Sequence, residues 1–311
     1  MLHQEIEIPS NKYLIKASLK IPDNKESKFG IVLAHGGIIN RQSLIREKYS
    51  FGEYLCKELG AFIIAPDLLG DTLHKQGVSY NNFSEILNIT TNYFVKKFNL
   101  NNVMGFGHSM GCFYLANSLS NNNHFTSIIN YGGPIRELYG SKKNSFFTYL
   151  IKYLTTYNYS INIKNLINRI FDKETCIYLE NTMLKNKEYY YDNYNFEFNS
   201  AMLRYVKEIT DSYLPLIINW GKPALLLFGS NDGVTRKTLS YYANKRLGKN
   251  IQIAEIKNAS HVTPCMDSVE QLSKMKPVLD FYQKTINLSN NSNSYYQAAR
   301  DMLPKLKTQI K

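Results

Sequence analysis

Four continuous apolar runs constrain the fold of this chain more than any other feature of its sequence. They read FGIVLAHGG (29–37), FIIAPDLLG (62–70), NVMGFGHSMG (102–111) and SIINYGGP (127–134). A run without polar alternation suits a strand buried on both faces, as in a parallel sheet. Segments with apolar residues at helical spacing separate the runs, at 41–59, 82–99 and 110–121. Strands that alternate with helices predict βαβ units, and therefore an α/β fold with a doubly wound, mostly parallel sheet.

The segments around this alternation complete the predicted sheet. Within residues 1–30, apolar and polar side chains alternate with period two, which predicts two half-buried antiparallel strands. The strand pattern stops at residue 134 and resumes with strands at 223–229 and 251–256 and helices at 235–247 and 266–285. The sequence thus predicts a core formed by residues 1–134 and 223–285. A helical insertion is predicted over 135–222, and a polar linker with a basic tail over 286–311.

Composition excludes several classes of protein. The net charge is +12, but the basic residues are spread along the chain, whereas a nucleic-acid binder concentrates them in a patch. The N-terminal segment lacks the apolar stretch of a secretory signal, and no run is long enough to span a membrane. The four cysteines are far apart and form no disulfide framework or zinc motif. We expect a cytoplasmic protein that does not bind nucleic acid. The tail is expected to be a frayed terminus, with a peripheral membrane or partner contact as the alternative.

No motif indicates a metal or an organic cofactor. His3, His74 and His124 are isolated, and no paired histidines occur at metal-binding spacing. The glycines of GFGHSMG stand at 105, 107 and 111, which does not fit a dinucleotide-binding loop. We therefore expect neither a metal nor a cofactor.

The segment Gly107-His108-Ser109-Met110-Gly111 fits the pattern G-x-S-x-G between a buried strand and a helix. In that context the pattern is a nucleophile elbow, a sharp turn that exposes the serine above the strand ends. The flanking glycines are needed because a Cβ there would collide with the adjacent strand and helix. Ser109 is therefore the candidate nucleophile, and His108 is expected to be a packing residue of the elbow.

A serine nucleophile needs a base, and the base needs an orienting acid. Asp232 follows the predicted strand 223–229 and His261 follows the strand 251–256, both at carboxyl ends, where open α/β sheets keep their sites. Taken alone, Asp232 could be only a turn former and His261 only a helix-capping loop residue. The expected oxyanion donors are the backbone N–H groups of Met110 and Gly37, with Ile38 as the alternative. His35, in the same loop as Gly37, is expected to brace that loop.

Together these motifs resemble the α/β-hydrolase superfamily over about residues 5–285. The His-Ser-Met sequence at the elbow is similar to that of the branch containing esterases, lysophospholipases, monoglyceride lipases and C–C hydrolases. The resemblance implies a Ser109–Asp232–His261 triad, a lid formed by the insertion after the sixth strand, and no cofactor. Two positions depart from the family pattern: the turn 66–71 reads PDLLGD, and Cys112 follows Gly111.

The expected function is therefore hydrolysis of a small-molecule carboxylic ester or thioester through an acyl-enzyme. The many apolar and aromatic side chains of the insertion suit an apolar acyl group, although they could equally serve only to pack the lid. Acyl transfer to another acceptor and C–C bond hydrolysis remain open on the same triad. A non-catalytic binding protein is a further alternative, since fold does not imply function. The sequence leaves the oligomeric state and the acyl chain length open.

Overall fold

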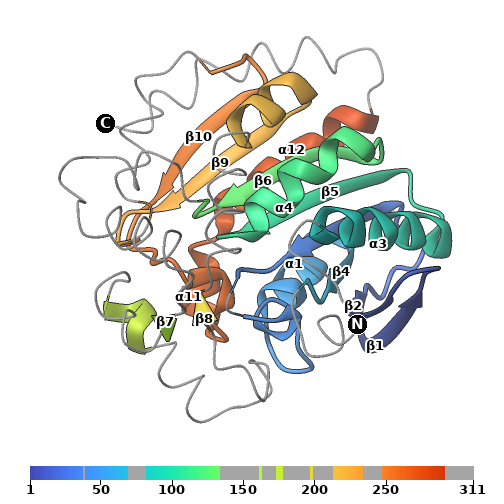
Figure 1. Ribbon diagram of the computed structural model, residues 1–311, viewed down its shortest axis with the longest axis horizontal. Helices are drawn as coiled ribbons and strands as arrows, with labels where there is room; N and C mark the ends of the chain where they lie inside the picture. Colours follow the sequence, from blue (N-terminus) through green and yellow to red (C-terminus); the bar gives the residue numbers. More distant parts are fainter. Residues whose placement is uncertain are drawn as a thin grey trace.

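A sheet of eight strands forms the centre of the protein (Figure 1). The computed structural model describes residues 1–37, 39–68, 82–133, 161–162, 173–177, 197–198, 213–233, 235 and 247–290. The sheet has the order β1-β2-β4-β3-β5-β6-β9-β10. Its strands are β1 (Leu2–Pro9), β2 (Leu14–Ile21), β3 (Phe29–Ala34), β4 (Phe62–Pro66), β5 (Asn102–His108), β6 (Phe125–Tyr131), β9 (Ala224–Gly229) and β10 (Ile251–Ile256).

The pairing within the sheet confirms the predicted doubly wound, mostly parallel architecture. β1 pairs antiparallel with β2, and β2 pairs antiparallel with β4. The other six strands run parallel to one another. The carboxyl ends of these six strands therefore meet at one edge, where an open α/β sheet keeps its functional site.

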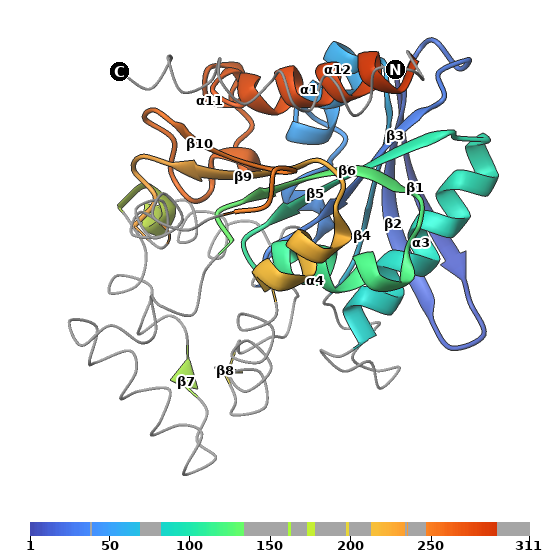
Figure 2. The same ribbon diagram turned by 90° about the horizontal axis from the view of Figure 1, so that it is seen from above.

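Helices cover both faces of the sheet (Figure 2). On one face lie α1 (Phe51–Leu59), α11 (Val269–Ser273) and α12 (Lys276–Asn290), and on the other lie α3 (Phe83–Phe98) and α4 (Gly111–Ser118). The side chains of β3 alternate between the two core clusters: Ile31 and Leu33 pack with α1 and α12, and Val32 packs with α3 and α4. Burial on both faces explains why the strand reads as an unbroken apolar run.

Two predicted helices differ from their observed counterparts. The helix expected over 41–59 begins only at Phe51, because the Ser50 side chain caps it by accepting from the Glu53 N–H. Before that cap, the chain forms a short 3-10 turn, η1 (Arg41–Ser43), and then a largely buried loop. The apolar spacing there reflects burial of the loop rather than a helix. The helix expected over 266–285 is divided into α11 and α12.

The last helix also corrects one predicted boundary. α12 continues to Asn290, so residues 286–290 are helical and not part of a polar linker. Ile286 explains the extension, since its side chain is buried among the core residues beneath this helix. Burial of one more apolar side chain favours another turn of helix.

Little of the insertion lies within the described residues. Residues 173–177 and 213–220 are helical, as expected. A short antiparallel pair, β7 (Ile161–Asn162) with β8 (Glu197–Phe198), also lies within the insertion, which was predicted to be helical. The alternation of Phe196, Glu197 and Phe198 is the period-two pattern that favours a strand. The rest of the predicted lid, most of the helix 235–247 and residues 291–311 lie outside the described residues.

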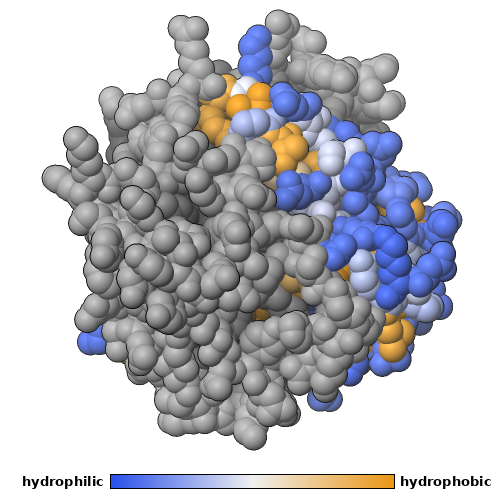
Figure 3. All heavy atoms as spheres, viewed as in Figure 1, coloured by the Kyte–Doolittle hydropathy of each residue, from blue (hydrophilic) through white to orange (hydrophobic). Residues whose placement is uncertain are grey.

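The described surface in the view of Figure 3 is hydrophilic over the side that carries α3, with an apolar group beside residues 213–220 and the edge strand β10. Leu214, Ile218 and Ile253, from these two elements, are partly buried hydrophobic residues that pack against the core. None of the helices in the described ranges is both long and apolar enough to cross a bilayer.

Candidate active site

Ser109 lies in a sharp turn between a strand and a helix, which is the backbone geometry that a nucleophile elbow requires. β5 ends at His108 and α4 begins at Gly111, so the turn is only two residues long. Ser109 adopts a φ of +53°, in the left-handed region. A non-glycine residue there costs about 1–2 kcal/mol, so the structure around it must hold the strain. The Ser109 N–H donates to the Tyr131 carbonyl at 2.9 Å, which ties the turn to the end of β6.

Glycines allow the elbow to pack closely. A Cβ on Gly107 would lie 2.6 Å from Cys112 Cα, and a Cβ on Gly111 would lie 2.1 Å from the Ala34 carbonyl oxygen. The start of α4 is therefore seated directly on the end of β3. The thiol of Cys112, one of the two departures from the family pattern, donates to the Gly107 carbonyl at 3.2 Å. A small side chain at 112 fits here and takes part in the turn.

The predicted acid and base are hydrogen-bonded to each other. His261 Nδ1 lies 2.9 Å from Asp232 Oδ2, and both side chains are buried. Thr235, which sequence reasoning missed, donates to Asp232 from its backbone N–H at 3.0 Å and also from its hydroxyl. Burial by itself raises the pKa of Asp232, but His261 and Thr235 outweigh it and the net pKa is lowered. The carboxylate is thus ionised and positioned. The signal for Thr235 was its place three residues after an aspartate, a spacing typical of side-chain caps.

Gly132 brings the base next to the elbow, and the sequence analysis did not single it out. Its φ is +63°, and a Cβ there would lie 3.1 Å from both Cε1 and Nδ1 of His261 and 3.2 Å from Asp232 Oδ2. Gly132 directly follows Tyr131, whose carbonyl accepts from Ser109. The structure therefore gathers Ser109, His261 and Asp232 around the end of β6. The double glycine that ends this strand was the available signal.

The loop after β3 lies over the elbow. A Cβ on Gly36 would be 3.3 Å from Ser109 Cβ, and the Met110 side chain lies against Gly37. Within the described residues, neither the Gly37 nor the Met110 amide donates to a backbone acceptor. Gly36 thus lies next to Ser109 and Gly37 next to Met110, and the role of the Gly37 and Met110 amides as oxyanion donors stays a prediction. The alternative donor, Ile38, lies outside the described residues.

His35 braces that loop, as expected. Its Nε2 accepts from the Leu68 N–H at 2.9 Å, and its Nδ1 donates to the Gly36 carbonyl at 2.8 Å. Burial lowers the pKa of His35 to about 4, so the ring is neutral at pH 7. The imidazole therefore links the candidate oxyanion loop to the end of β4.

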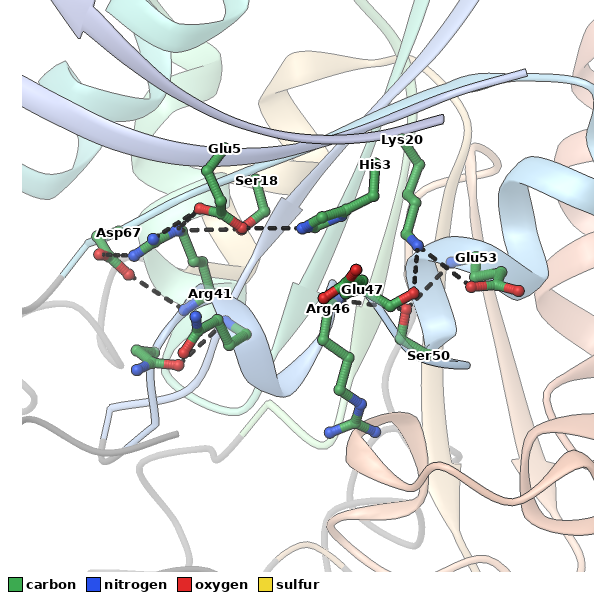
Figure 4. A network of polar contacts seen from close by, with 12 residues as sticks. His3, Glu5, Ser18, Lys20, Arg41, Arg46, Glu47, Ser50, Glu53 and Asp67 are labelled. Atoms are coloured by element: carbon green, nitrogen blue, oxygen red, sulfur yellow. Dashed lines mark hydrogen bonds and ion pairs between the residues drawn. The ribbon is translucent and has the colours of Figure 1, made fainter. Parts of the chain in front are cut away.

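A network of ion pairs holds the chain just after the loop that follows β3 (Figure 4). The Arg41 guanidinium pairs with Asp67 and with Glu5, and the Arg41 N–H donates to Asp67 Oδ1 at 3.2 Å. Burial raises the pKa of Asp67 to about 6 even though Arg41 acts to lower it. Asp67 belongs to the PDLLGD turn, the second departure from the family pattern. The Asp67 carboxylate holds Arg41, at the start of the segment that follows the loop.

His108 does more than the packing role predicted for it. It is buried, and its Nε2 lies 2.8 Å from the His261 carbonyl oxygen. Tyr131, which the sequence analysis did not single out, donates its hydroxyl to the Ser260 carbonyl at 2.6 Å. No local pattern signalled either contact, because each joins residues more than 120 positions apart in the chain.

As to metals, the described ranges contain no group of three or more His, Cys, Asp or Glu side chains arranged to hold an ion. The four cysteines are free thiols and all are buried.

Comparisons with known proteins support the fold and not a narrower identity. A scan against models of protein families finds no match, and no curated protein matches the sequence. Similar solved structures include Est1E from Butyrivibrio proteoclasticus, at 13% identity and a TM-score of 0.57, which covers 91% of this chain and 99% of that one. A carboxyl esterase from Bacillus coagulans aligns at 15% identity and a TM-score of 0.56, covering 83% and 90%. The mouse alpha/beta hydrolase domain-containing protein 10 aligns at 11% identity and a TM-score of 0.57, covering 91% and 99%.

Proposed function

On the premise that the chain has the α/β-hydrolase fold, we propose that it is a serine hydrolase of carboxylic esters or thioesters. The observation that carries the proposal is the buried hydrogen bond between His261 and Asp232, which lies against Gly132 beside the strained Ser109. A strained serine, a carboxylate and a histidine, in this chain order, are the parts of an acyl-transfer site. The esterase named among the similar structures supports an ester as the substrate.

In the proposed reaction, Ser109 Oγ attacks the carbonyl carbon while His261 Nε2 takes its proton. The Asp232 carboxylate accepts the Nδ1–H of His261, which fixes the tautomer and stabilises the imidazolium that forms. The imidazolium then protonates the leaving alcohol or thiol as the carbon–oxygen or carbon–sulfur bond breaks. In the second half, His261 takes a proton from water, which attacks the acyl carbon. The bond from the acyl carbon to Ser109 Oγ then breaks, His261 returns the proton to Oγ, and the acid is released.

The negative charge that develops on the substrate oxygen would be held by the Gly37 and Met110 amides. Loss of one such donor typically costs about 10²–10³ in rate, so these two amides carry much of the proposed catalysis. The N-terminus of α4 lies beneath the same position and favours negative charge there. The bond from His35 to the Gly36 carbonyl and the Arg41–Asp67 pair support the proposal that this loop is held in place before substrate binds.

The acyl group is proposed to be apolar and to bind beneath the insertion. Tyr213, near the end of the insertion, is buried and packs edge-on against Phe113 of α4 at 5.2 Å between ring centroids. A Cβ on Gly133 would lie 3.0 Å from the Tyr213 hydroxyl, so this tyrosine also borders the strand end beside the site. The insertion thus contributes at least one aromatic side chain next to the candidate triad.

The test is hydrolysis of a chain-length series of p-nitrophenyl esters and acyl thioesters by the wild type and by Ser109→Ala. We expect turnover by the wild type, loss of turnover in the variant, and an unchanged melting temperature. Addition of alcohol or amine acceptors then separates hydrolysis from acyl transfer, because a transferase would form the new ester or amide. Turnover that survives in Ser109→Ala would refute the mechanism. Cytoplasmic location and the absence of nucleic-acid binding remain predictions.

A further inference from the structure

The loop that carries His261 is held by side chains from the centre of the sheet. It lies between β10 and α11 and contains the 3-10 turn η7 (Thr263–Cys265). Within the loop, the Thr263 N–H donates to the Ser260 carbonyl at 3.3 Å. Two consecutive carbonyls of this loop accept hydrogen bonds from side chains: Ser260 O from the Tyr131 hydroxyl at 2.6 Å, and His261 O from His108 Nε2 at 2.8 Å.

The protonation of His108 follows from its partners. A carbonyl can only accept, so Nε2 must carry the proton and Nδ1 must be the lone-pair nitrogen. Nδ1 faces the Cys265 thiol at 3.8 Å, a weak donor from the far end of the same loop. Burial lowers the pKa of His108 to about 3, with the neighbouring His261 acting in the same direction. The ring is therefore a neutral, directional donor throughout the pH range in which a neutral His261 can act as a base.

His108 and Tyr131 act from the same place on the sheet. They are register partners on the parallel strands β5 and β6, and their rings lie 6.1 Å apart. The centroid of the His108 ring is also 5.2 Å from that of His261. Neighbouring residues in register project from the same face, so the two donors meet consecutive carbonyls of the loop as a pair.

We propose that His108 and Tyr131 are positioning residues that clamp the His261 backbone and thereby set the distance from base to nucleophile. This inference rests on the proposed function. His108 directly precedes Ser109, so one short stretch of β5 both presents the nucleophile and holds the loop of its base. Tyr131 has the same double role, because its carbonyl accepts from the Ser109 N–H while its hydroxyl donates to Ser260.

Tyr131→Phe tests the clamp, and Tyr282→Phe is its matched control. Tyr282 is also a buried tyrosine whose hydroxyl donates to a backbone carbonyl, that of Gly105 in β5, at 2.7 Å. Both variants lose one buried hydrogen bond, so we expect similar decreases in melting temperature. We expect kcat for ester hydrolysis to fall about 10-fold with KM unchanged in Tyr131→Phe only, since a shift of about 1 Å in a reacting group can cost 10²-fold. Equal kcat values in the two variants would overturn the proposal.

A second pair of variants tests His108. In His108→Gln the side-chain amide can still donate near the position of Nε2, whereas His108→Met has similar size and no donor. We expect His108→Gln to keep kcat within about threefold of wild type and His108→Met to lose about 10-fold or more. A loss of equal size in both would show that packing, and not the hydrogen bond, is what matters.

Failure of the clamp and failure of the proposed function give different results. If the wild type hydrolyses none of the esters, the function is wrong, and crystal structures of Tyr131→Phe and Tyr282→Phe still test the clamp. Displacement of the His261 ring in Tyr131→Phe alone would support the clamp. An unmoved ring in both variants would refute it.

Discussion

Replacement of Gly132 by alanine measures how closely the candidate triad is packed. The substitution has two effects that the structure separates. The first is backbone strain, because φ is +63° at this residue. For a residue with a Cβ, that conformation costs about 1–2 kcal/mol. The second is a direct contact, because the new methyl group would lie 3.1 Å from Cε1 and Nδ1 of His261.

Gly60 offers a control that has only the first effect. It ends α1 with a φ of +60°, and a Cβ there would have nothing within 4 Å. Both alanine variants should therefore lose about 1–2 kcal/mol of stability from strain, or roughly 2–8 °C in melting temperature. Gly132→Ala can lose more, depending on how far the neighbouring side chains move.

Only Gly132→Ala should impair catalysis. Carbon atoms pack at about 3.5–4.0 Å, so the imidazole must move by roughly 0.5 Å to accommodate the methyl group. A displacement of 1 Å can cost about 10²-fold, so we expect kcat to fall about 10-fold. The assay is ester hydrolysis at saturating substrate, with melting followed by circular dichroism. If Gly132→Ala and Gly60→Ala have the same kcat, the ring does not depend on the space that Gly132 leaves, and the packing argument is wrong.

Two other predictions concern Arg41 and His108, which support the candidate site without being proposed to react. Arg41→Met should reduce stability by about 3–5 kcal/mol, because it leaves the buried Asp67 carboxylate without its cation. Urea unfolding measures the loss, and a change under 1 kcal/mol would contradict a buried pair. Acidification should also destabilise the protein through His108. Because burial lowers the pKa of His108 to about 3, the folded state binds fewer protons than the unfolded state below pH 6.5, and stability falls as pH decreases. His108→Gln should therefore reduce the slope of stability against pH by roughly 1.4 kcal/mol per pH unit between pH 6 and 4, and an unchanged slope would show that His108 is protonated in the folded state.

The sheet could be predicted from the sequence because a strand buried on both faces is a continuous apolar run. Such a run can be recognised without knowing which strands pair with it. Val32 and Leu33 face opposite sides of the sheet, and both are apolar because helices cover both sides. The elbow was predictable because its constraints are local: Gly107, Ser109 and Gly111 stand within five residues. The buried loop before α1 was wrongly predicted to be part of a helix. Apolar side chains near helical spacing also occur in a loop that is covered on several sides.

What the sequence could not predict are contacts between distant residues. No local sequence pattern marks Tyr131 or Ser260. Their importance follows only from the fold, which places the Tyr131 hydroxyl beside the Ser260 carbonyl. Gly132 is one of many glycines, and its importance depends on an imidazole that arrives from residue 261. The pairing of His261 with Asp232 was predicted from topology, because parallel strands bring their carboxyl ends to one edge. The catalytic roles of Ser109, Asp232, His261, Gly37 and Met110 remain predictions that activity measurements must test.

Labelling with a fluorophosphonate probe, which reacts only with an activated serine, tests whether Ser109 is the nucleophile. The wild type, Ser109→Ala and Asp232→Asn are incubated with the probe, and the modified peptide is identified by mass spectrometry. We expect a single adduct on Ser109, no adduct in Ser109→Ala, and slower labelling in Asp232→Asn because the His261 tautomer is no longer fixed. A folded wild type that remains unlabelled, or an adduct on another serine, would refute the proposed mechanism.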